Sequence, residues 1–220
     1  MEEEARHDLD LIVAAVLTLL GLIIGFSFSM ATNRYDLRKS HEEAEANAIG
    51  TEYVRADFLP ASEASKLRAL LTEYLDQRIL YYEARDEHEL QQVHARTVQL
   101  QSELWSTVQV SASVQQTPVM TLIVSGMNDV LNAKGYTQAG WQNRIPEGAW
   151  LLMGAVAVFS NLLVGYDTHS TEKGIVRQLA LPLVVSIAFF LIADIDSPRR
   201  GIILVRPQNL ISLAQSMHSN

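Results

Sequence analysis

Carboxylate and imidazole side chains fall at metal-ligand spacing in two groups: His41, Glu42 and Glu45, then Glu87, His88 and His94. Both residue types bind divalent transition metals when they gather on one face of a helix. The charged face of a solvated helix produces the same groupings without any metal. A metal site and a solvated face both remain open at this stage, and no metal is assigned.

Two more acids, Asp194 and Asp196, close an apolar stretch and are followed by Arg199 and Arg200. Their carboxylates could pair with the arginines or cap local backbone, or they could line a cation path or bind a divalent ion. We favour the structural role. Asn161 lies inside another apolar stretch, where a buried amide needs partners, and we therefore expect it to hydrogen-bond to neighbouring helices.

Several functions are disfavoured by what the chain lacks. No recognisable nucleophile with its base and no phosphate-binding loop is present, so we expect neither an enzyme nor a cofactor. The absence of cysteine excludes disulfides and thiolate metal sites. A net charge of −8 provides no basic patch for nucleic acid.

Residues 11–30 form an uninterrupted run of 20 uncharged residues, enough for a helix of about 30 Å that spans a bilayer. Small residues recur every fourth position at Gly21, Gly25 and Ser29, a pattern that allows close approach of another helix. A second row at the same spacing consists of Thr18, Leu22 and Phe26. One row could pack while the other faces a lumen, or both could be packing faces.

Apolar residues also concentrate at 150–166 and 179–193, whereas most charges lie between residues 34 and 103. This distribution predicts an all-α integral membrane protein with three transmembrane helices and long cytoplasmic helices. We expect a first transmembrane helix in residues 1–35, a cytoplasmic helical region at 36–144, a transmembrane hairpin at 145–196 and a cytoplasmic tail at 197–220.

The flanking charges predict the orientation. Five acids and one arginine occupy residues 1–10, whereas Arg34, Arg38 and Lys39 follow the first apolar run. By the positive-inside rule the N-terminus lies outside and the C-terminus in the cytoplasm. The acidic start is unlike a signal peptide, so we expect the helix to be retained. The predicted location is the bacterial inner membrane, which helices rather than barrels span.

Helix boundaries follow from proline and capping residues. The first helix should continue to about residue 59 and stop at Pro60, with Ser62 as the N-cap of the next helix. Pro118 should open a helix that ends near residue 133. Residues 135–143 then form a predicted loop that touches the membrane interface through Tyr136 and Trp141, and Pro146 opens the hairpin.

A family resemblance rests on longer segments. The run from Gly25-Phe26 through Ser29 to Arg34-Tyr35 resembles the neck-helix pattern G-F-x-x-S-x-x-x-x-R of bestrophins. Residues 45–56, 145–147 and 191–198 make nearly the whole chain similar to the bacterial bestrophin-like membrane protein family. The first bestrophin crossing and the clustered acidic calcium clasp have no counterpart here.

The resemblance implies a homopentameric ion channel with a central pore and a cytoplasmic vestibule. Register places the inward neck positions on Thr18, Leu22 and Phe26, where apolar rings could constrict the pore. Glutamates of residues 36–59, together with Asp194 and Asp196, hint at cations. The alternative is a non-conducting, membrane-anchored helical scaffold. The expected partners are further copies of the chain, the lipid bilayer and inorganic ions.

Overall fold

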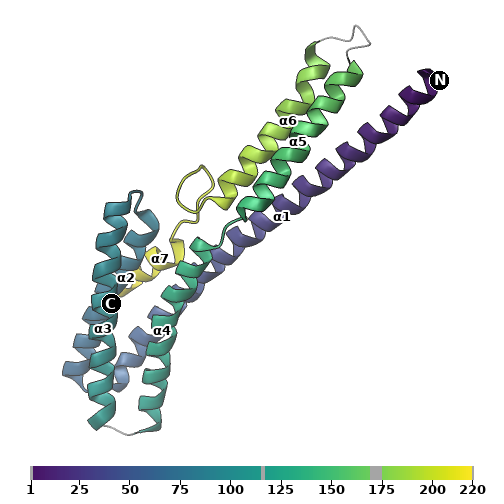
Figure 1. Ribbon diagram of the computed structural model, residues 1–220. Coiled ribbons are helices and arrows are strands. Elements are labelled where there is room, and N and C mark those ends of the chain that lie inside the picture. Colours follow the sequence, from purple (N-terminus) through teal and green to yellow (C-terminus); the bar gives the residue numbers. More distant parts are fainter. Residues whose placement is uncertain (1, 115–116, 169–174, 220) are drawn as a thin grey trace. The chain divides into compact units, whose positions relative to one another are not determined.

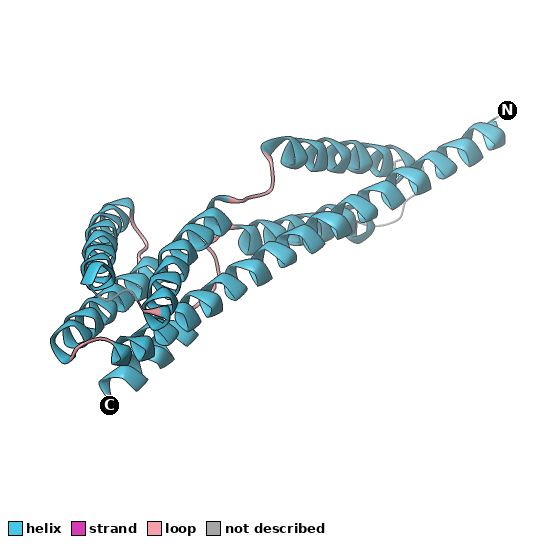
Figure 2. Cartoon of the chain, turned by 90° about the horizontal axis from the view of Figure 1, so that it is seen from below, coloured by secondary structure: helices cyan, strands magenta, loops and turns pink. Residues whose placement is uncertain are grey.

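The computed structural model describes residues 2–114, 117–168 and 175–219, and every regular element within them is a helix (Figure 2). The prediction of an all-helical fold is therefore confirmed for these residues. The helices of Figure 1, in chain order, are α1 (Glu2–Arg55), η1 (Ala56–Phe58), α2 (Ala61–Glu83), α3 (Glu87–Val114), α4 (Pro118–Gln142), α5 (Glu147–Thr168), α6 (Ile175–Asp196) and α7 (Gln208–His218).

The chain divides into two compact units. Unit one comprises Met1–Tyr35 and Arg144–Ile203, and unit two comprises Asp36–Asn143 and Leu204–Asn220. Helix α1 contributes its first part to unit one and its remaining turns to unit two. The segment after α6 is also divided between the units. It belongs to unit one up to Ile203 and to unit two from Leu204 onward, where α7 follows.

Three segments of the described chain are long and apolar enough to cross a membrane: His7–Phe58, Pro118–Tyr166 and Leu179–Asp196. In the first segment the uncharged part is residues 11–30, and the turns that follow carry many charges. The predicted number of membrane-crossing segments is thus confirmed by length and composition. The connection between the second and third apolar stretches of the predicted hairpin falls partly on residues 169–174, outside the described residues.

Unit one is built around two apolar clusters. In the first, Leu20 of α1 packs with Ala157 of α5 and Val185 of α6. In the second, Ala31 of α1 packs with Ile145, Ile192 and Ile195. Both clusters draw on α1, α5 and α6, and α5 and α6 run side by side (Figure 1).

Unit two has the larger apolar core. Its fully buried aliphatic, methionine and tyrosine side chains come from α1, α2, α3, α4 and α7, among them Ile49, Leu67, Leu71, Tyr74, Leu75, Leu100, Leu104, Ile123, Met127, Val130 and Leu210. The members from α2 repeat every three or four residues, as one face of a helix requires.

The predicted start of α4 is confirmed and that of α2 is wrong. Thr117 is the N-cap of α4, where its hydroxyl accepts the backbone N–H of Met120 at 3.3 Å and Pro118 takes the first helical position. Helix α2 instead begins at Ala61, directly after Pro60, so Ser62 lies inside the first turn and is no N-cap. Pro60 itself takes the N-cap position, and its carbonyl accepts the Ala64 backbone N–H at 2.9 Å.

The predicted loop at 135–143 is also wrong, because α4 continues to Gln142. Trp141, expected at the membrane interface, is 5% exposed and packs against Tyr81 and Tyr82 with ring centroids 5.2 Å apart. A Cβ at Gly140 would lie 3.0 Å from the His41 ring. Gly140 therefore permits close packing of α4 on α1 rather than breaking the helix.

Candidate functional site

The first part of α1 has one packed face. Leu20 is 2% exposed and Ala31 is fully buried. Ser27, between them on the same side, is also buried. Leu20 and Ala31 belong to the two apolar clusters of unit one, so this face of α1 packs within the unit.

The row formed by Thr18, Leu22 and Phe26 lies on an uncovered face. Leu22 is 54% exposed and Phe26 is 64% exposed. Thr18 is exposed as well, and its hydroxyl donates to the Ala14 carbonyl of the preceding turn at 2.8 Å. This hydrogen bond leaves an almost wholly apolar surface along the row, because the hydroxyl is turned to its own backbone.

The small-residue row is uncovered too. Gly21, Gly25 and Ser29 are all exposed. A Cβ placed on Gly21 or Gly25 would meet nothing within 4 Å. No contact with the described residues therefore requires glycine at either position. A close approach along this row needs a second chain.

Asn161 was predicted to hydrogen-bond to a neighbouring helix, but its amide nitrogen bonds within its own helix. Its side-chain Nδ2 donates to the Ala157 carbonyl of its own helix at 2.8 Å. The side-chain oxygen Oδ1 is buried and has no hydrogen-bond partner. An amide side chain reaches the carbonyl four residues back without help from a neighbouring helix, which explains the local bond.

The Asp194 carboxylate binds backbone after the end of α6. It accepts the N–H groups of Ile202 and Ile203, both at 2.8 Å. Gly201 adopts φ +145, and a Cβ there would lie 2.5 Å from Asp194 Oδ1. The carboxylate therefore holds a turn that only glycine fits.

Asp196 binds two other parts of unit one. Its carboxylate accepts the Ile145 N–H at 3.1 Å and a guanidinium N–H of Arg34 at 3.3 Å. The carboxylate is thus bound to the segment before α5 and to α1.

The first histidine and glutamate group is divided among different contacts. Glu42 accepts the backbone N–H of Asn209 at 2.8 Å and that of Leu210 at 3.0 Å, which caps the start of α7. Glu45 pairs with Arg78 and accepts the Thr137 hydroxyl at 3.0 Å. His41 stacks on Tyr136, with ring centroids 6.1 Å apart.

In the second group, Glu87, His88 and His94 are exposed. His88 approaches the Gln92 side chain at 3.4 Å. Among the described residues, no set of three or more acidic, histidine or cysteine side chains could hold a metal ion. The charges of both groups are used in packing or face solvent.

The buried ion pair of Glu45 and Arg78 was not predicted. Glu45 is fully buried and Arg78 is 2% exposed. The Arg78 guanidinium also lies 4.5 Å from the centre of the Tyr81 ring. A sequence signal was present, because Arg78 continues the apolar stripe of Leu71 and Leu75 at helical spacing.

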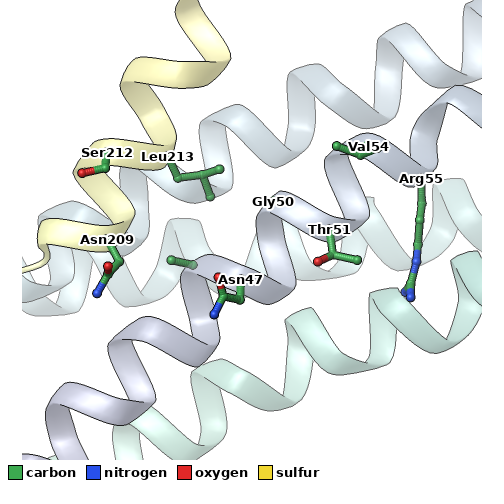
Figure 3. Close-up of a pocket in the computed structure, with 9 residues that line it drawn as sticks. Asn47, Gly50, Thr51, Val54, Arg55, Asn209, Ser212 and Leu213 are labelled. Carbon is green, nitrogen blue, oxygen red and sulfur yellow. The ribbon is translucent and has the colours of Figure 1, made fainter.

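A groove of about 590 Å³ lies between α1 and α7 in unit two (Figure 3). Gly50 and Leu213 meet there, and a Cβ on Gly50 would lie 3.0 Å from Leu213 Cδ1. Polar side chains of both helices line the rest of the groove, among them Asn47, Thr51, Asn209 and Ser212. This groove was not predicted, because no helix was expected at residues 208–218.

The helical fold and its three apolar segments define an α-helical membrane protein. The Bestrophin-like domain model matches residues 7–210, and the chain belongs to the bestrophin-like family. The resemblance noted in the sequence is thereby confirmed. No curated protein sequence matches the chain.

Solved structures with the same fold are known. A mutant of a bacterial bestrophin homologue from Klebsiella pneumoniae matches with a TM-score of 0.73 at 9% identity, over 94% of this chain and 85% of that chain. A second structure of a Klebsiella pneumoniae homologue gives a TM-score of 0.70 at 10% identity, over 93% and 83% of the two chains. A mutant described as a membrane protein gives 0.74 at 9% identity, over 94% and 85%.

Proposed function

We propose that this chain assembles into an oligomeric ion channel of the bacterial inner membrane, with the first part of α1 lining the pore. The observation that carries the proposal is the two-sided character of this helix. Leu20 and Ala31 are buried against α5 and α6, whereas Leu22 and Phe26 are 54% and 64% exposed. Membership of the bestrophin-like family supports the same assignment.

The uncovered row suits a constriction. Around an axis of symmetry, Thr18, Leu22 and Phe26 would repeat as three rings along about 12 Å, from a rise of 1.5 Å per residue. Narrow apolar rings resist wetting, and a dewetted constriction stops ions without using charge. The row itself gives no preference for anions or cations, because it has no charged residue.

The small-residue row suits contact between copies. Gly21 and Gly25 have open space around their Cα atoms within the chain. Small residues let two helix backbones approach closely in a membrane, where lipid offers no hydrophobic drive for association. Five copies are favoured, as the resemblance to bestrophins implies.

The orientation that we propose follows the charged flanks of α1. The acidic N-terminal flank lies outside, and Arg34, Arg38 and Lys39 mark the cytoplasmic side. In this orientation unit two, which includes α7, lies in the cytoplasm.

The alternative is a non-conducting scaffold anchored by the three crossings. It is supported by apolar side chains exposed on unit two, of which Val54 is 63% and Phe58 is 59% exposed. On this alternative the Leu22 and Phe26 row faces lipid, and unit two binds a protein partner.

Native mass spectrometry of the full chain in mild detergent, combined with planar-bilayer recording, separates the two functions. The channel requires a closed ring, five copies being expected, and a current that appears with the purified protein. A monomer or dimer that passes no current would overturn the channel and leave the scaffold. Reversal potentials in asymmetric salt then give the ion preference.

A further inference from the structure

Glu52 of α1 is an acid in the core of unit two without a hydrogen-bond partner. Its side chain is fully buried, and neither carboxylate oxygen is hydrogen-bonded. Buried carboxylates elsewhere in the unit are bound: Glu42 accepts backbone N–H groups and Glu45 pairs with Arg78. A buried carboxylate without hydrogen bonds is costly in its charged form and much less so when it carries a proton.

The nearest cation is held by another group. Arg55 Nη1 lies 3.7 Å from Glu52 Oε2, beyond hydrogen-bonding distance. The same Nη1 donates to the Leu122 backbone carbonyl of α4 at 3.1 Å. Figure 3 shows the Arg55 side chain extending from α1 towards the neighbouring helix. Arg55 therefore joins the end of α1 to α4, while Glu52 lies beside it at ion-pair distance without a direct hydrogen bond.

Gly126 of α4 provides the space in which these two side chains meet. A Cβ at this position would overlap both Glu52 Oε2 and Arg55 Nη1. Any larger residue would displace one or both groups. Glycine in the middle of α4 lowers helix propensity, and this packing requirement explains its presence.

Other charged groups lie on α4, α2 and η1. Asp129 of α4 acts on Glu52 from a distance and favours its protonated form. On α2, Arg68 pairs with Asp57 of η1, and Glu63 accepts the Ser111 hydroxyl of α3. Burial raises the pKa of Glu52 to about 7, against the lowering effect of Arg55.

We propose that Glu52 is a proton-binding switch that determines whether Arg55 joins α1 to the Leu122 carbonyl of α4. With Glu52 protonated, Arg55 remains on the carbonyl and the end of α1 is fixed to α4. When Glu52 releases its proton to solvent, its negative charge draws the guanidinium from 3.7 Å into direct contact, and the bond to Leu122 is lost. Since Gly126 leaves room for both side chains, the exchange needs no movement of the helix backbones.

This switch does not depend on ion conduction. If α1 also lines a pore, the state of Glu52 would act on the cytoplasmic continuation of the same helix. The inference is therefore tested by measurements that need no current.

The first measurement is an infrared pH titration of the purified full chain with three proteins: wild type, Glu52→Gln and Glu43→Gln. Glu43 is an exposed glutamate on the same helix and serves as the matched control. The carbonyl band of a protonated carboxylic acid should persist up to neutral pH and disappear as the pH rises through about 7 in wild type and Glu43→Gln. It should be absent from Glu52→Gln. An identical band in all three proteins, or no such band in wild type, would overturn the proposal.

Hydrogen exchange tests whether the contact between Arg55 and α4 depends on the protonation of Glu52. After correction for intrinsic rates, the segment around Leu122 and Gly126 should exchange faster above pH 7 than below it in wild type. Glu52→Gln, which imitates the protonated acid, should stay protected at both pH values. Arg55→Gln should lose this pH difference while its Glu52 band disappears at a higher pH, because the cation that lowers the pKa of Glu52 is gone. Equal pH dependence in wild type and Glu52→Gln would refute the switch.

Discussion

The Asp196 carboxylate accepts the Ile145 backbone N–H at 3.1 Å and the Arg34 guanidinium at 3.3 Å. One side chain at the end of α6 is thereby bound to α1 and to the segment that leads into α5. All three belong to unit one. In the proposed orientation, Asp196 is thus placed to fix the cytoplasmic ends of the three crossings.

Replacing this carboxylate should weaken unit one. For Asp196→Asn we expect a loss of roughly 1–3 kcal/mol, the usual range for a buried hydrogen bond to a charged group. Thermal unfolding in detergent measures the effect, and Glu147→Gln, at an exposed acid in the first turn of α5, is the control. An unchanged unfolding temperature for Asp196→Asn would show that the two contacts do not stabilise the protein.

Gly201 should tolerate no side chain. Its φ of +145 is unfavourable for L-residues, and a Cβ would lie 2.5 Å from Asp194 Oδ1. Gly201→Ala should therefore increase proteolytic cleavage in the segment after α6. Gly135→Ala is the matched control, because a Cβ at Gly135 in α4 would meet nothing within 4 Å, and there alanine should stabilise the helix by up to about 1 kcal/mol. Equal cleavage of both variants would contradict the structural reason.

The buried pair of Glu45 and Arg78 should show strong non-additivity. Arg78→Met leaves the fully buried Glu45 without its cation, which typically costs about 3–5 kcal/mol. Adding Glu45→Met should recover part of the loss, because the uncompensated charge is removed as well. Denaturant unfolding of both single variants and the double variant gives the coupling. Additive losses would mean that the pair is not coupled.

Glu52 should make stability depend on pH in a defined direction. Its pKa is about 7 in the folded chain against 4.5 for the free side chain, so the folded state binds the extra proton between these values. The contribution of protonated Glu52 to the free energy of unfolding is fully present below pH 4.5. It falls as the pH rises to about 7, and above that pH the effect of Glu52 no longer changes. The difference in unfolding temperature between wild type and Glu52→Gln, measured across this range, should follow that course. A difference that grows in wild type's favour with rising pH would contradict it.

The sequence was most informative where a single residue determines a helix end. Pro118 and Pro146 marked the starts of α4 and α5 because proline suits the first turn regardless of tertiary contacts. The end of α4 was missed, since Gly135 and Gly140 look like breakers in sequence whereas Trp141 and Thr137 are buried in the folded unit.

Only part of the candidate site could be predicted from the sequence. Helical spacing alone placed Thr18, Leu22 and Phe26 on one row, and the structure leaves that row exposed. The buried roles of Glu45, Glu52 and Arg78 were not foreseen, because a charged residue normally indicates solvent and only the packing of several helices reveals the exception.

The uncovered face of α1 carries the row of Thr18, Leu22 and Phe26. If Leu22 and Phe26 form apolar rings at a constriction, Leu22→Ala combined with Phe26→Ala should widen and wet it, which raises conductance or leak while leaving the oligomer intact. Gly25→Leu should instead disrupt assembly, because a large side chain prevents close helix approach. Leu162→Ala, at a 67% exposed leucine of α5, should change neither property. Planar-bilayer currents and native mass test all three variants together. Loss of the oligomer in the double variant, or silence of both it and the wild type, would make this row a packing surface.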